Sequence, residues 1–209
     1  MILTALIFLA FAFIHSVTVS IWFKNLCNKI LGSTFMGVWY RFLYTTVSIV
    51  TALVAIVLLS KVPDRVFWTA PWWLRAAMHG IQVAGLVFGA RAFEYMDARE
   101  FMGIRQVWRY LMRGEISGNI EGVSEKGLVT TGVYGIVRHP LYAAGLVIFT
   151  ISPVITVNGL TLTVMADLYF LFGVFIEERR FVRIFGDEYH RYQARVPALI
   201  PTVLRRRRG

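Results

Sequence analysis

Long apolar runs alternate with short polar segments along most of this 209-residue chain. The apolar runs lie at about residues 2–23, 36–60, 73–95, 140–157 and 160–176. Because roughly 20 apolar residues span the hydrocarbon core of a bilayer, the pattern predicts an all-α integral membrane protein with about five transmembrane helices. The last two runs are short, and residues 152–159 between them contain turn-forming residues and no charge. We expect these two runs to form a C-terminal helical hairpin.

Two further segments have helical patterns outside the apolar runs. Residues 100–112 place apolar side chains at helical spacing opposite a basic face, which predicts an amphipathic helix at the membrane interface. Residues 177–195 are expected to continue the fifth run into the cytoplasm as a helix. Residues 114–126 read as a flexible loop that could close over a site.

The predicted organisation is one structural domain in two parts. Residues 1–95 form a three-helix membrane anchor. Residues 96–209 form a catalytic part with the interfacial helix, the hairpin and cytoplasmic cofactor-binding segments.

Charge gives the expected orientation in the membrane. Lys and Arg number 22 against 12 Asp and Glu, and most of them follow the first, third and fifth runs. Basic residues gather in cytoplasmic loops, so we expect the N-terminus outside and the C-terminus in the cytoplasm of a prokaryotic inner membrane. The same residues favour anionic membrane lipids as partners, and no nucleic-acid-binding motif accompanies them. Cys27 is the only cysteine, so neither an internal disulfide nor a cysteine-based metal site is expected.

Charged groups stand at the ends of the last two runs. Arg138 and His139 precede Pro140, a residue that suits the first turn of a helix. Backbone N–H groups at a helix start attract anions, and a ligand carboxylate would fit there. Glu177 and Glu178 follow the fifth run and point in different directions around a helix. These groups indicate a ligand site at the membrane surface, although snorkelling side chains at helix ends would give the same pattern.

Polar residues also occur inside the apolar runs. His15 lies in the first run, and Arg41, Tyr44 and Ser48 share one helical face of the second. They fit either a substrate pocket or hydrogen bonds between helices. Asp167 in the fifth run has the same two interpretations.

Two separated motifs resemble the isoprenylcysteine carboxyl methyltransferase and phospholipid methyltransferase superfamily. The first is Gly-Val-Tyr-Gly-Ile-Val-Arg-His-Pro-Leu-Tyr at residues 132–142, and the second begins Ile-Glu-Glu-Arg-Arg-Phe at residue 176 and ends Ala-Arg-Val-Pro at residue 197. The resemblance covers residues 126–201 and implies S-adenosylmethionine as the methyl donor.

The resemblance also implies roles for individual residues. His139 and Glu178 would hold the amino-acid end of the donor, with help from Arg138, Tyr142 and Glu177. The residues that would line the adenosine are Leu128, Val129, Gly132 and Tyr134.

A second resemblance, to the methanethiol S-methyltransferase group, narrows the expected substrate. It comprises Glu-Phe-Met-Gly-Ile-Arg-Gln-Val at residues 100–107, His-Ser at 15–16 and Arg-Val-Pro-Ala-Leu-Ile-Pro at 195–201. Isoprenylcysteine enzymes usually carry an Arg shortly before the paired Glu, and residues 171–176 contain none. The resemblance therefore favours a small thiol such as methanethiol over a prenylcysteine carboxylate.

Thiol methylation requires a thiolate nucleophile. Arg105 or Arg41 could lower the pKa of the thiol, and Glu100 or His15 could take its proton; the sequence leaves this choice open.

Two alternative functions remain for the whole chain. One is methylation of a lipid amine or a prenylcysteine carboxylate, and the other is a non-enzymatic haem-binding accessory protein that uses His15 and His79.

Overall fold

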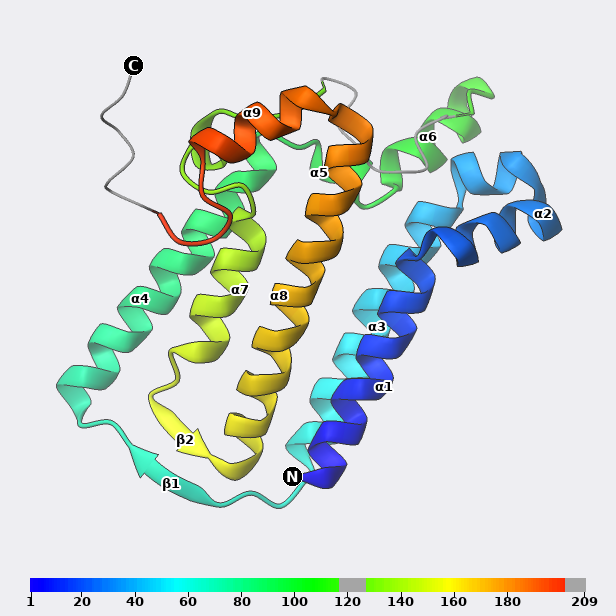
Figure 1. Cartoon of the computed structure of the whole chain (residues 1–209). Helices are drawn as coiled ribbons and strands as arrows, with labels where there is room; N and C mark the ends of the chain where they lie inside the picture. The colour runs from blue at the N-terminus through cyan, green and yellow to red at the C-terminus, as the bar shows by residue number, and fades with distance from the viewer. Residues whose placement is uncertain (117–126, 202–209) are drawn as a thin grey trace. The chain divides into compact units, whose positions relative to one another are not determined.

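The computed structural model describes residues 1–116 and 127–201, which divide between two compact units (Figure 1). Unit 1 comprises Met1–Pro63 and Met96–Glu125, and unit 2 comprises Asp64–Tyr95 and Lys126–Gly209. The boundaries differ from the expected division at residue 95, because the third apolar run belongs to unit 2 and the interfacial segment to unit 1. The expected lid loop lies mostly in residues 117–126, outside the described residues.

Unit 1 begins with α1 (Ile2–Val19), α2 (Ile21–Val38) and α3 (Tyr40–Ser60), of which α1 and α3 lie side by side (Figure 1). The first apolar run was expected to be one helix but is interrupted at Ser20, whose backbone is extended. The Ser20 hydroxyl accepts from the Phe23 N–H at 3.2 Å and so caps α2. The chain in α2 then kinks at Gly32, where φ is 82°.

The interfacial segment of unit 1 forms two short helices, α5 (Ala98–Phe101) and α6 (Ile104–Arg113), where one helix was expected. The break is at Gly103, with φ of 79°. A Cβ there would lie 2.3 Å from the backbone nitrogen of Phe42 on α3. Glycine at this position therefore allows both the left-handed backbone and the close approach of the two chain segments.

Unit 2 contains three long or apolar helices, α4 (Trp72–Ala90), α7 (Pro140–Thr150) and α8 (Val157–Phe185), with α7 packed against both others (Figure 1). Gly89 on α4 faces Ala144 on α7, and a Cβ at Gly89 would lie 2.7 Å from the Ala144 Cβ. Small residues at such a contact let two helix backbones approach closely, as is common in membranes. Short 3-10 turns, η1 (Arg91–Glu94) and η2 (Gly132–Gly135), follow α4 and precede α7.

A small antiparallel ribbon of β1 (Val66–Thr69) and β2 (Val154–Thr156) lies at one end of unit 2. The segment between the last two apolar runs was expected to be the tight turn of a helical hairpin, but part of it pairs as β2. The backbone groups of residues 154–156 thereby obtain partners that a helix connection would not supply.

Three described helices are long and apolar enough to cross a membrane: α1, α3 and α8. Together with the high helical content, this supports an all-α integral membrane protein. The predicted five crossings and the transmembrane hairpin are not confirmed. The fourth run gives only 11 residues of helix in α7, short of the roughly 20 that span a bilayer.

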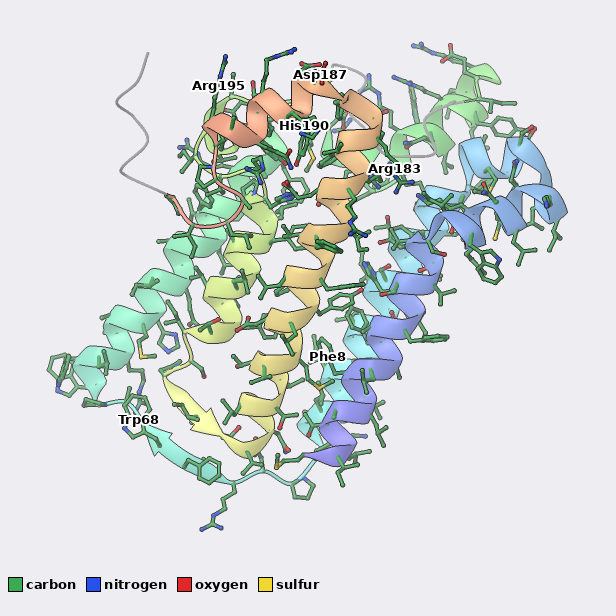
Figure 2. The ribbon with its side chains drawn as sticks, in the orientation of Figure 1. Phe8, Trp68, Arg183, Asp187, His190 and Arg195 are labelled. Atoms are coloured by element: carbon green, nitrogen blue, oxygen red, sulfur yellow. The ribbon has the colours of Figure 1, made fainter. Side chains whose placement is uncertain are left out.

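Helix α8 has 29 residues and extends past its apolar stretch to Phe185. It ends at Gly186, with φ of 53°, and α9 (Asp187–Arg195) follows in a new direction. In Figure 2, Arg183, Asp187, His190 and Arg195 lie around this bend, at the end of unit 2 opposite Trp68 on β1. The side chains of Tyr189, Tyr192 and Val196 form a small buried core on the inner side of α9, with Leu128 and Phe181 packed against it.

Candidate functional site

The carboxylate of Glu178 is the centre of a hydrogen-bonded cluster at the bend between α8 and α9. Arg138 donates to both of its oxygens at 2.9 Å, through Nε and Nη2. His139 Nε2 lies 2.6 Å from Oε1, and the Tyr189 hydroxyl donates to the same oxygen at 2.8 Å. Gln193 donates to Oε2. We call these five residues the inner cluster.

The inner cluster is held in place by the segment that follows α9. The Arg138 and His139 backbone N–H groups donate to the carbonyls of Pro197 and Ala198, at 2.9 and 3.0 Å. Arg138 Nη1 also donates to the carbonyl of Val196. These two N–H groups were expected to be available for an anion, but in this structure the chain itself occupies them.

His139 is the most enclosed member of the cluster, with a side chain 2% exposed. Burial alone would lower its pKa, but the hydrogen bonds and negative charges of Glu177 and Glu178 outweigh that effect and raise the pKa. The Tyr189 hydroxyl has a raised pKa for two reasons, burial first and then its hydrogen bond to Glu178. The cluster therefore favours a positively charged imidazole between two carboxylates and a protonated phenol beside them.

A second pair of charges, Glu177 and Arg180, lies on the outer side of the cluster. His139 Nδ1 is 3.3 Å from Glu177 Oε2, and Arg180 Nη2 is 4.0 Å from Glu177 Oε1. The side chains of Glu177 and Arg180 are 28% and 23% exposed, compared with 16% for Glu178. We call Glu177 and Arg180 the outer pair.

Of the residues expected to line an adenosine, Gly132 and Tyr134 form part of η2, before α7. Gly132 has φ of 61°, and a Cβ there would lie 2.0 Å from the Tyr95 ring. The backbone carbonyl of Tyr134 accepts from the Tyr192 hydroxyl at 2.6 Å. Burial, together with the nearby charge of Glu177, raises the pKa of Tyr134 to about 12.

The other expected donor residues also belong to unit 2. Leu128 packs on the core of Tyr189 and Tyr192, and Val129 is half-buried. The Tyr142 ring stands edge-on to His139, with 5.7 Å between ring centroids. All nine residues proposed from the resemblance are thus in one unit, and five of them, Arg138, His139, Tyr142, Glu177 and Glu178, make contacts around His139.

The four residues expected to act on the acceptor, His15, Arg41, Glu100 and Arg105, all belong to unit 1. His15 lies 3.1 Å from the Ser48 hydroxyl and 3.1 Å from the Tyr44 hydroxyl, so both ring nitrogens have partners across α1 and α3. This arrangement fits the structural interpretation, hydrogen bonds between helices. Arg41 Nε donates to the carbonyl of Phe101 at 2.8 Å.

Arg105 and Glu100 have contrasting surroundings on α5 and α6. Arg105 pairs with Asp97, which also caps α5 by accepting from the N–H groups of Arg99 and Glu100. Glu100 Oε1 and Gln106 Oε1 are buried, and neither finds a hydrogen-bond partner among residues 1–116 and 127–201. Buried acceptors without donors are uncommon, so this part of unit 1 is a candidate for contact with a proton-donating ligand.

Sequence reasoning missed Gln193, Gln106, Asp97 and Arg180 as members of these clusters. Gln193 and Arg180 lie within the second motif, so the motif itself could have identified them. The interpretation of the motif concentrated on the paired glutamates instead. Asp97 stands just before a short helix, where Asp commonly caps.

Asp167 accepts from Thr150 on α7 at 2.8 Å, which fits its structural interpretation as a hydrogen-bonding partner between helices. His15 and His79 belong to different units, and His79 contacts Gln82 at 2.9 Å.

Comparisons with known proteins find similar methyltransferases. The chain is 31% identical over 121 residues to a methanethiol S-methyltransferase of Bradyrhizobium diazoefficiens, covering 58% of this chain and 40% of that protein. It is 32% identical over 104 residues to a methanethiol S-methyltransferase of Crocosphaera subtropica, covering 50% and 38%. It is 34% identical over 80 residues to the protein-S-isoprenylcysteine O-methyltransferase of Schizosaccharomyces pombe, covering 36% and 34%. No family model matches the chain, and no solved structure matches it significantly.

These relatives confirm the resemblance of the chain to the isoprenylcysteine carboxyl methyltransferase superfamily. Within that superfamily, it is similar to the proteins named methanethiol S-methyltransferase. The chain spans about two fifths of the length of the first of these relatives.

Proposed function

We propose that this protein is an S-adenosylmethionine-dependent membrane methyltransferase that methylates a small thiol such as methanethiol. Three apolar helices of membrane-spanning length and the named relatives support this class of enzyme. The observation that carries the proposal is the inner cluster with its outer pair, because it gathers charges of both signs at one end of unit 2. The donor has an amino-acid end that carries both an ammonium and a carboxylate.

The residues present fit this donor. Arg180 has a buried Nε with no hydrogen-bond partner among the described residues, and Glu177 retains partial exposure. Gly132 lets the backbone pass where a side chain would overlap Tyr95, close to Tyr134 in η2. When bound, S-adenosylmethionine supplies an electrophilic methyl group on a sulfonium. The chain's own residues then have to orient that group, exclude water and prepare the nucleophile.

Preparing the nucleophile means removing the thiol proton. Of the four candidates in unit 1, Arg41 and Arg105 carry permanent positive charge and can stabilise a thiolate but cannot accept a proton. Both ring nitrogens of His15 have hydroxyl partners. Glu100 alone among the four is a carboxylate with a buried oxygen that lacks a partner in the described residues. We propose Glu100 as the proton acceptor.

A donor held by these residues of unit 2 would supply its sulfonium methyl group to the thiolate sulfur, which would leave a thioether and S-adenosylhomocysteine. Glu100 would keep the thiol proton. The basic residues after the apolar runs support a cytoplasmic C-terminus.

The substrate class is tested by supplying purified protein with methyl-labelled donor and three kinds of acceptor: small thiols, amino-phospholipids and prenylcysteines. We expect label in the thioether. Label that appears only in lipid or only in a methyl ester would replace the thiol by the corresponding alternative acceptor.

A further inference from the structure

The outer pair has unused binding capacity that the inner cluster lacks. Arg180 Nε is buried, yet it donates to no acceptor within residues 1–116 and 127–201. The distance of 4.0 Å between Arg180 Nη2 and Glu177 Oε1 is too long for a hydrogen bond. A buried guanidinium donor loses its water partners, so this arrangement is favourable only if an acceptor replaces them.

The inner cluster has little capacity left for a ligand. The two oxygens of Glu178 already accept five hydrogen bonds from Arg138, His139, Tyr189 and Gln193. Arg138 also donates through Nη1 to two carbonyls of the chain, those of Gln193 and Val196. A charged ligand at this end of α8 therefore finds unused donors and acceptors in the outer pair.

We propose that the outer pair recognises the zwitterionic amino-acid end of the donor, Arg180 binding its carboxylate and Glu177 its ammonium. This inference rests on the proposed function. Glu177 and Arg180 are three residues apart on one helix, so their side chains are neighbours with opposite charges. A guanidinium presents a planar fork of donors that matches a carboxylate, which makes Arg180 suited to this part of the ligand.

His139 has an indirect role in this arrangement. Its Nδ1 contacts Glu177 and its Nε2 contacts Glu178, so it links the outer pair to the inner cluster. His139 and Glu178 are then positioning residues that fix Glu177 toward the ligand. Arg180 and Arg179 each lie over a ring, Arg180 over Phe181 at 5.3 Å and Arg179 over Phe175 at 4.1 Å. Arg179 and Arg183 differ from Arg180 in being exposed.

The test compares two ligands that differ only in the carboxylate: S-adenosylhomocysteine and its decarboxylated analogue. Calorimetry on the detergent-solubilised protein measures both affinities for wild type, Arg180→Gln and Arg179→Gln. We expect Arg180→Gln to weaken S-adenosylhomocysteine binding by about ten- to a hundredfold and to leave the decarboxylated analogue unchanged. Arg179→Gln should bind both ligands like wild type. Arg180→Lys should keep part of the affinity, because it keeps the charge without the fork.

Two results would overturn the inference while leaving the proposed function intact. One is Arg180→Gln binding S-adenosylhomocysteine like wild type. The other is an equal loss of both ligands, which would show that Arg180 supports the structure and does not contact the carboxylate. If wild type binds neither ligand, the proposed function falls, and this inference falls with it. A reciprocal measurement with an analogue lacking the amino group should single out Glu177→Gln in the same way.

Discussion

Glu178→Ala is the most informative single change, because five hydrogen bonds converge on this carboxylate. The side chains of Arg138 and Glu178 are only 11% and 16% exposed, so the substitution leaves a nearly buried guanidinium without its counter-ion. Breaking a buried ion pair by removing one partner costs about 3–5 kcal/mol. The five hydrogen bonds do not add independently, since they share two acceptor oxygens.

The expected result is loss of donor binding in a protein that keeps its helices. Much of the cost should fall on the packing of α9 and residues 196–198 against the start of α7, because Arg138, Tyr189 and Gln193 connect these segments through Glu178. Calorimetric titration with S-adenosylhomocysteine measures binding, and circular dichroism of the same sample measures helix content. Glu188→Ala, at an exposed position in α9, is the matched control.

Donor affinity within about twofold of wild type in Glu178→Ala would refute this reasoning. It would mean that the inner cluster does not organise the donor site, whatever the effect on stability. A complete loss of helix content would instead show that the cluster is needed for the fold, and Glu178→Gln, which keeps the shape and part of the hydrogen bonding, would then separate the two effects.

Three further predictions follow from named contacts. His139 has a raised pKa in the folded protein, so its stabilising contribution is complete below its unfolded pKa of about 6.5 and is lost as pH rises through the folded pKa. Thermal melts should therefore show the largest difference in melting temperature between wild type and His139→Gln below about pH 6.5, and a smaller difference at about pH 9. Glu100→Gln should slow methylation of an alkyl thiol by about a hundredfold or more and leave S-adenosylhomocysteine binding unchanged. The variant should keep its activity toward an aromatic thiol, because such a thiol is already ionised at neutral pH. Equal loss of activity with both thiols would exclude a proton-acceptor role. Gly132→Ala should destabilise the protein by about 1–3 kcal/mol, because its Cβ would overlap the Tyr95 ring and its φ is positive; a melting temperature equal to that of wild type would contradict this.

The sequence predicted the membrane class and the proximity of three members of the inner cluster because both depend on local pattern. Apolar runs of sufficient length identify α1, α3 and α8, and the paired motifs identify Arg138, His139 and Glu178, which the structure brings into contact. The helix breaks at Ser20 and Gly103 were missed because each depends on a specific contact that hydropathy does not encode. Ser20 accepts a hydrogen bond from the Phe23 N–H, and Gly103 lies against the Phe42 backbone.

The unexpected members of the site were missed for a related reason. Gln193 is fifteen residues from Glu178, and the bend at Gly186 that brings it back depends on one glycine in a conformation that periodicity cannot reveal. The extent of α7 was overestimated because the apolar run continues to about residue 157, whereas the helix ends at Thr150. In the structure, this stretch pairs with residues more than 80 positions earlier in the chain.

The contact between Arg138 and Val196 sets an order for assembly during synthesis. These residues are 58 positions apart, and the carbonyls that satisfy Arg138 and His139 belong to residues 196–198. A ribosome must therefore have produced all of α8 and α9 before the start of α7 can be completed. Until then Arg138 and His139 at the start of α7 lack these carbonyl partners, which makes the late arrival of residues 196–198 the step that closes unit 2.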